Sequence, residues 1–303
     1  MPHTNLSKKK RLIYLALCVI AFLILAPLTA WYATGYRFSD TYQFTKTGGI
    51  YIATEGKGFS VLLDNKEQEV SSLFRRSFFI QNLHPGIYSL KVTKPGYLSW
   101  EKSVTVLSEK VTEGYPFNLP ATTTLVEIPK TLALDGENTS TGTISTLKNK
   151  ETTNEDYINA KALFATTSSK LVTQKVSSST LGEPEQIFLS GKTGLWSAGG
   201  EIFAEWKGEM DAIPSYFCTN EVCMRKVLVY KGEKVNGVDF LFGKDAFIIF
   251  ALDSGIYVTE IDARGGRNTQ PLVIGKGYDF RIDRNQVLFI KKGMSYYHLG
   301  VSL

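Results

Sequence analysis

The stretch LHPGIYSLKVTKPGYLSW, residues 83–100, holds a short alternating segment with a Pro-Gly pair at each end. Between the two pairs, apolar side chains at Tyr88, Leu90 and Val92 alternate with polar ones. A period of two is typical of a strand with one buried face. Because proline fixes φ and glycine accepts positive φ, the two Pro-Gly pairs predict turns at both ends of this strand.

The alternation continues beyond the second Pro-Gly pair. Leu98, Trp100, Val104 and Val106 share one parity, and polar side chains occupy the other. This pattern predicts a second strand that runs antiparallel to the first around a tight turn.

The residues upstream predict further short strands. They cover Ile50–Ala53, Phe59–Leu63 and the segment RSFFIQNL at 76–83, with a turn at DNKE, 64–67. About 70 residues of strands joined by tight turns predict a small all-β sandwich.

This layout resembles the PEGA domain, a surface-associated β module of bacteria and archaea, from Gly48 to about Val111. The motif that names the family, Pro-Glu-Gly-Ala, is reduced here to its Glu55-Gly56 centre. The family is not known for catalysis, so the resemblance implies a structural or binding role. Two further patterns, L-x-P-G-x-Y and K-x-G-Y-x-x-W, match at Leu83, Pro85, Gly86, Tyr88, Lys94, Gly96, Tyr97 and Trp100.

The N-terminal region has the features of a membrane anchor. Lys8–Arg11 are all basic, and no charged residue occurs from there until after Tyr36. A helix of about 20 apolar residues spans a bilayer. We therefore predict a cytoplasmic basic tail at 1–11 and a transmembrane helix at 12–36, with the chain beyond it extracytoplasmic. Trp31, Tyr32 and Tyr36 are expected at the outer interface of the cell membrane.

A cleaved signal peptide is the alternative interpretation of this region. Cleavage after Ala30 would place Leu28, rather than a small residue, at the −3 position. The apolar run is also longer than the core of a signal peptide. These features favour a retained signal-anchor and a single-pass protein.

The net charge of +5 does not indicate a nucleic-acid partner. Lys8–Arg11 supply four of these charges, so the rest of the chain is nearly neutral. A nucleic-acid-binding domain needs a basic face on its folded part. The predicted partners are the lipid bilayer and an envelope protein or glycan.

The composition divides the chain after the membrane segment into three parts. Residues 118–155 are rich in Thr, Ser, Asn and charge, which is typical of a linker. The apolar patch Leu125–Ile128 could still add one strand to a neighbouring sheet. The predicted domains are therefore a sandwich at 41–117, a polar linker at 118–155 and a repeat domain at 156–303.

The C-terminal part contains a repeat with an offset of about 40 residues. The segment from Val238 aligns with the segment from Tyr278, and fainter copies lie at 194–206 and 158–176. A period near 40 with several strands per unit is typical of β-propeller blades. The expected fold is all-β after one transmembrane helix: a small PEGA-like β-sandwich followed by propeller-like β repeats.

Motifs for catalysis, cofactors or metal ions are scarce. His3, His84 and His298 form no zinc-binding pattern, and the sequence has no GxSxG motif and no glycine-rich phosphate loop. We therefore predict no catalytic, cofactor-binding or metal-binding residues. Four aromatic residues are possible ligand contacts: Tyr97, Trp100, Trp196 and Trp206. For Trp100, the alternation of the strand favours a position in the core instead.

Two classes of function fit these features. The first is a non-catalytic binding or structural protein of the cell envelope, anchored by its N-terminal helix. The second is a surface hydrolase that uses the repeat domain as its scaffold. The second class needs converging carboxylates or a nucleophile and base, which the sequence does not mark.

Cys218 and Cys223 flank the four residues TNEV and are candidates for a disulfide. If the flanking segments IPSYF and MRKVLVY form a hairpin, the two cysteines face each other within bonding distance. The alternatives are two free thiols or a stray pair of metal ligands. Two ligands are too few for a structural zinc site. An extracytoplasmic location favours the disulfide.

Overall fold

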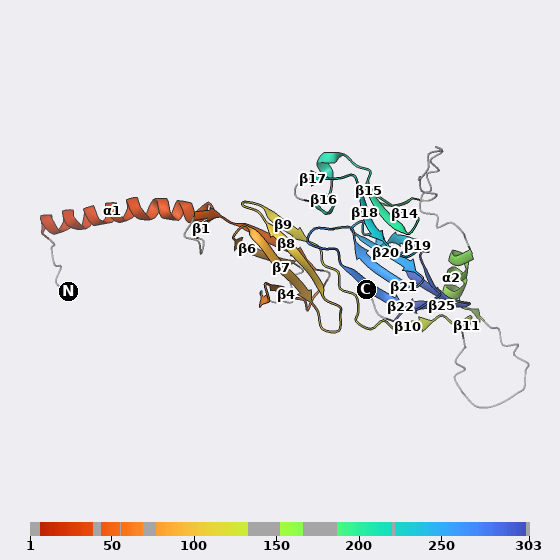
Figure 1. Cartoon of the computed structure of the whole chain (residues 1–303). Coiled ribbons are helices and arrows are strands. Elements are labelled where there is room, and N and C mark those ends of the chain that lie inside the picture. The colour runs from red at the N-terminus through yellow and green to blue at the C-terminus, as the bar shows by residue number, and fades with distance from the viewer. Residues whose placement is uncertain are drawn as a thin grey trace, which may run out of the picture. The chain divides into compact units, whose positions relative to one another are not determined.

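The structure is a computed structural model that describes residues 7–38, 44–54, 56–68, 77–132, 152–165, 187–219 and 222–300. The chain divides into two compact units. The first unit combines Met1–Val92 with Ser103–Phe117, and the second combines Thr93–Lys102 with Asn118–Leu303. Most of the described elements are β-strands, with one long apolar helix at the N-terminus (Figure 1).

The N-terminal helix α1 spans Lys8–Ala33 and is long and apolar enough to cross a membrane. It begins within the basic cluster, because lysine is a good helix former, and it ends three residues before Tyr36. At its end the Thr34 backbone N–H donates to the Ala30 carbonyl, and Gly35 takes a φ of 85°. Glycine at positive φ is a common helix stop, so the helix ends where a glycine first allows it.

Besides a short hairpin that follows α1, the described residues of the first unit form two small β-sheets. In one, β3 (Gly48–Ala53) lies between antiparallel β6 (Ser77–Leu83) and parallel β9 (Val111–Gly114). The other has the order β5-β4-β7-β8. The bounds of its strands are Lys66–Glu67, Ser60–Leu63, Gly86–Thr93 and Trp100–Val106.

The predicted strands of this region are confirmed, and alternate side chains of each sheet are buried. Ser103 and Thr105 of β8 are exposed, as the alternation predicts. The buried apolar side chains are Ile50, Ile52, Val61, Leu63, Leu90, Val92, Val104 and Val106. Two β-sheets, each with one buried face, fit the predicted small sandwich.

The turns of this module differ in kind. Asp64 and Asn65 both have positive φ, which is the two-residue hairpin turn that DNKE predicts. At the second Pro-Gly pair, Tyr97 N–H donates to the Lys94 carbonyl, and Gly96 has a φ of 79°. At the first pair the chain bends at Pro85, between the end of β6 and the start of β7, as predicted. Gly86 is already the first residue of β7 and does not have a positive φ, and the bend leads from one β-sheet to the other.

A small hairpin that the sequence analysis did not predict follows α1. Strand β1 (Tyr36–Phe38) pairs antiparallel with β2 (Phe44–Lys46). Only Thr34 and Gly35 separate the helix from this hairpin, so the two elements are adjacent (Figure 1).

The second unit contains three four-stranded antiparallel sheets. The first has the order β13 (Phe188–Ser190), β14 (Thr193–Ala198), β15 (Glu201–Trp206), β18 (Lys226–Lys231). The second has the order β19 (Gly237–Phe240), β20 (Phe247–Leu252), β21 (Gly255–Glu260), β22 (Thr269–Ile274). The third has the order β10 (Leu125–Glu127), β25 (Ser295–Leu299), β24 (Leu288–Lys292), β23 (Tyr278–Ile282).

The 40-residue repeat is present in the structure. Asp239 of β19 and Asp279 of β23 each accept a hydrogen bond of 2.8 Å from the backbone N–H of the following residue. Strand β14 contacts β19, and β21 contacts β23, so successive sheets are linked. Among the described residues no closure of the three sheets into a propeller ring is found.

The first part of the predicted linker is ordered. Strand β10 completes the third sheet, with Leu125 opposite Leu299, as its apolar patch predicts. Ile128 is buried, and β11 (Thr131–Leu132) pairs with β12 (Thr152–Thr153). The prediction of a connector over 118–155 was therefore wrong for 118–132, because β10 is a strand of the third sheet and Ile128 packs with Phe289 and Tyr296 of that sheet. Residues 133–151 lie outside the described residues.

The predicted repeat copy at 158–176 was wrong where the structure describes it. Helix α2 spans Glu155–Ala165, and the Asn154 side chain accepts a hydrogen bond from the Asp156 N–H at its first turn. This is a helix-capping arrangement, which outweighs the weak strand pattern. The remainder of the predicted copy, 166–176, lies outside the described residues. Apolar side chains at helical spacing pack near Phe289 and Tyr296: Tyr157, Ala160, Leu163 and Phe164.

Candidate functional site

Three of the four aromatic side chains predicted as possible ligand contacts are buried. The exposed fractions are 0% for Trp100, 4% for Trp196 and 6% for Trp206. The Trp206 indole N–H donates to the Glu209 carbonyl, which explains how its polar edge is satisfied. These indoles pack in cores and present no face to a ligand. Only Tyr97, beside Lys94, stays partly exposed.

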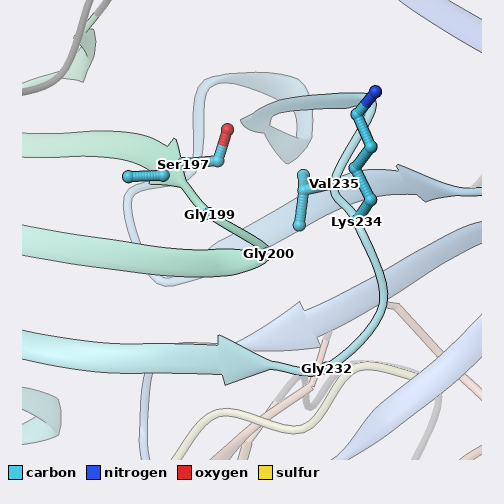
Figure 2. A pocket seen from close by; sticks show the side chains of 7 residues that line it. Ser197, Gly199, Gly200, Gly232, Lys234 and Val235 are labelled. Carbon is cyan, nitrogen blue, oxygen red and sulfur yellow. The ribbon is translucent and has the colours of Figure 1, made fainter.

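A pocket of about 400 Å³ lies at one end of the first sheet of the second unit (Figure 2). The end of β14 supplies Ser197, the β14–β15 turn supplies Gly199 and Gly200, and the loop after β18 supplies Gly232 and Lys234. Both turn glycines have positive φ, so this two-residue turn needs them. The loop is held close, because the Gly232 N–H donates to the Gly200 carbonyl at 3.2 Å.

The lining of this pocket is suited to binding rather than to acid–base chemistry. Among the described residues that line it, Lys234 alone is charged, and Ser197 supplies a hydroxyl group. No histidine or carboxylate lines it within the described part of the chain, so Ser197 has no base there. Its volume lies at the lower end of the range for small-molecule sites. The arrangement can hold a small polar group against an ammonium and exposed backbone.

Neither of the two described histidines lines this pocket. His84 Nδ1 lies 2.9 Å from the Thr45 hydroxyl, and His298 Nε2 lies 3.5 Å from an Asp156 carboxylate oxygen. His3 lies outside the described residues. In the ranges that the structure covers, no group of three His, Cys, Asp or Glu side chains is placed to hold a metal ion.

Carboxylates at the turns of the repeats bond to nearby backbone. Asp262 accepts from the Arg264 N–H, and Asp283 accepts from the Asn285 and Val287 N–H groups. Such contacts are typical of aspartate in turns.

A buried ionic cluster in the second unit was missed by the sequence analysis. Lys102 Nζ lies 3.0 Å from Glu260 Oε1 and 3.3 Å from Asp262 Oδ2, and its side chain is 2% exposed. Burial raises the pKa of Glu260 against the lowering effect of Lys102. Burial would also raise the pKa of Asp262, but Arg264 and Lys102 together lower it. The sequence does contain one sign of this cluster: Lys102 occupies a position of β8 whose alternate neighbours, Trp100 and Val104, are buried and apolar.

A second buried carboxylate lies on β19. Asp239 is almost fully buried, and burial raises its pKa to about 6. The Phe240 N–H and the Arg281 guanidinium oppose this shift without cancelling it. Arg281 itself pairs with Asp279 at 2.9 Å. A pKa of about 6 lies well above the ordinary range of an aspartate, and burial is the main cause.

Cys218 and Cys223 are joined by a disulfide, with their Cα atoms 3.9 Å apart. They face each other in the short ladder of β16 (Cys218–Thr219) and β17 (Val222–Cys223). This hairpin is shorter than the segments IPSYF and MRKVLVY would give, because Ser215–Phe217 forms a 3-10 helix and β18 pairs with β15. Two other short 3-10 helices cover Met210–Ala212 and Leu241–Gly243.

We expect the Cys218–Cys223 bond to stabilise the protein by at most about 2–3 kcal/mol, because it closes a small loop. The full chain, unfolded without reductant, should label with maleimide at Cys18 only. After reduction it should label at three cysteines. The Cys18→Ala variant is the matched control, and labelling of that variant before reduction would show that the bond is absent.

No family model matches the chain, and no curated protein matches its sequence. The resemblance to the PEGA domain therefore stays a prediction, which rests on the motifs around Pro85-Gly86 and Gly96-Tyr97 and on the strand layout.

Proposed function

We propose that this protein is a single-pass membrane protein that displays its two β units outside the cytoplasm. The observation that carries the proposal is α1, a 26-residue helix whose apolar side chains are exposed along its length. Exposed apolar side chains over this length are unfavourable in water and favourable in a bilayer.

The distribution of charge favours one orientation. Lys8–Arg11 occupy the first turn of α1, and basic residues favour the cytoplasmic side of a membrane. The Cys218–Cys223 disulfide supports the same assignment, since disulfides persist in oxidising compartments.

We further propose that the displayed units bind an envelope protein or glycan and do not catalyse a reaction. The resemblance to a non-catalytic surface module supports this role for the first unit. The pocket between the Gly199-Gly200 turn and Lys234 supports it for the second, because the described residues that line it offer hydrogen-bonding groups and include no histidine or carboxylate.

A reporter fused after Leu303 tests the orientation. We expect alkaline phosphatase to be active at this position, because it requires an oxidising compartment, and a fluorescent protein that folds only in the cytoplasm to be dark. The same two fusions to a chain that lacks residues 8–33 are the control: the phosphatase should be inactive and the fluorescent protein bright. A bright cytoplasmic reporter on the full chain would overturn the proposal.

A further inference from the structure

The hairpin after α1 carries an exposed aromatic cluster. The Phe44 ring lies 5.7 Å from the Trp31 ring of α1 and 5.2 Å from the Phe38 ring, measured between centroids. These three side chains are 57%, 54% and 56% exposed, respectively. The apolar surface of α1 therefore continues onto the hairpin instead of ending with the helix.

The hairpin has two different faces. Phe38 and Phe44 are directly opposite each other across β1 and β2. On the other parity, Arg37 donates to the Asn82 side chain at 2.7 Å, and the Thr45 hydroxyl lies 2.9 Å from His84. This face thus contacts the β module, and the phenylalanine pair lies on the opposite face. Lys46 shares the parity of the phenylalanines at the other end of the hairpin, where it pairs with Glu109 at 2.6 Å.

The joint between α1 and the hairpin is tied by hydrogen bonds. The Thr47 N–H and hydroxyl donate to the Gly35 carbonyl at 3.1 and 3.0 Å. Arg37 donates to the Tyr32 carbonyl at 2.8 Å, and its guanidinium lies 3.7 Å from the centre of the Tyr32 ring. A cation is favourable at a helix C-terminus, so these contacts hold the hairpin against the last turn of α1.

The position of Trp31 fixes the depth of this cluster. About 20 residues are needed to cross the hydrocarbon core, and counted from Leu12 these end near Trp31. The headgroup region beyond the core is only about 5–8 Å thick on each side. Because Phe44 contacts Trp31, its ring lies within or beside that region.

We propose that the β1–β2 hairpin is a membrane-interfacial element whose Phe38 and Phe44 side chains, together with Trp31, insert into the outer boundary between headgroups and acyl chains. This inference rests on the proposed function, because it requires that α1 crosses the bilayer. Aromatic side chains favour this boundary. Insertion would hold the joint between α1 and β1 at the membrane surface.

Depth-dependent fluorescence quenching tests this inference on the full chain in phosphatidylcholine–phosphatidylglycerol vesicles. An environment-sensitive label is placed at native Cys18, which is exposed on α1. In a Cys18→Ala background it is placed at Phe44→Cys, Phe38→Cys or Lys57→Cys. Lys57 is the matched control. It follows the C-terminal end of β3, and the six residues of β3 place that end about 20 Å from the end that adjoins β2. Labelling is done without reductant, and unlabelled Cys18→Ala protein gives the background.

We expect the label at Cys18 to be quenched most by nitroxide lipids whose spin label lies deep in the acyl chains. The labels at positions 38 and 44 should be quenched most by lipids labelled near the headgroup, with a blue shift of emission. The label at position 57 should lose almost no emission. If positions 38 and 44 behave like 57 while Cys18 is quenched, the anchor stands and the hairpin inference is wrong. If Cys18 is not quenched, both the anchor and the inference are wrong.

Discussion

Replacing Lys102 with Met should lower the free energy of unfolding by about 3–5 kcal/mol, because it removes one partner of a buried ion pair. Glu260 would keep its carboxylate inside the second unit without the ammonium that balances it. Asp262 would lose one of its two cationic partners and keep the other, Arg264, at 2.8 Å. The Trp100 indole N–H, 3.4 Å from Glu260 Oε2, and the Asn268 amide cannot replace a full charge. Circular dichroism of the full chain in detergent, followed through urea unfolding, measures the loss.

Two further variants separate the lost ion pair from general damage. The exposed Lys57→Met is the matched control and should change stability by less than about 0.5 kcal/mol. Adding Glu260→Gln to Lys102→Met should restore part of the loss, since it removes one uncompensated charge. An effect of Lys102→Met no larger than that of Lys57→Met would show that the cluster does not stabilise the fold.

Stability should also depend on pH through Asp239. Its carboxyl has an ordinary pKa of 3.8 when the chain is unfolded and about 6 when it is buried in the fold. As the pH rises from about 4 to about 6, the unfolded state loses the proton first, so the native state becomes relatively less stable. At 1.36 kcal/mol per pKa unit, this contribution falls by about 3 kcal/mol over that window and then stays constant.

The Asp239→Asn variant isolates this effect. An amide can still accept the 2.8 Å hydrogen bond from the Phe240 N–H, but it does not ionise. The stability of the variant relative to the natural protein should therefore increase by about 3 kcal/mol between pH 4 and above pH 6. Asp279→Asn, at the equivalent position of the next repeat, controls for loss of a carboxylate with the same backbone contact. A stability difference for Asp239→Asn that does not change with pH would contradict the burial of an ionisable group.

The strands were predictable where local chemistry decides them. The alternation around Leu90 and Val104 and the Asp64-Asn65 turn act over neighbouring residues, and the structure contains both. The 40-residue repeat was visible because equivalent residues, such as Asp239 and Asp279, make the same contact in two sheets.

Contacts between segments far apart in the sequence were not predictable in the same way. In the sequence, Lys102 is one polar residue within a strand. Its partner Glu260 is remote in the chain, and only the fold shows that the two side chains form an ion pair. Helix α2 has its cap at Asn154 and its packing partner at Tyr296, and the pattern of 158–176 alone indicated a strand copy. The candidate pocket is formed by a turn and a loop that are separate in the sequence, and several of its lining residues are glycines, which have no side chain that could indicate a binding site.

Labelling from outside intact cells tests most directly whether the β units are displayed across the membrane. In a Cys18→Ala background, Met294→Cys places a thiol at a turn residue that is 93% exposed, and Ser7→Cys places one at the N-terminal end of α1. A membrane-impermeant maleimide should label Met294→Cys in spheroplasts without permeabilisation and should label Ser7→Cys only after lysis. The Cys18→Ala parent gives the background. Labelling of Ser7→Cys in intact spheroplasts, with Met294→Cys protected until lysis, would contradict the proposed orientation.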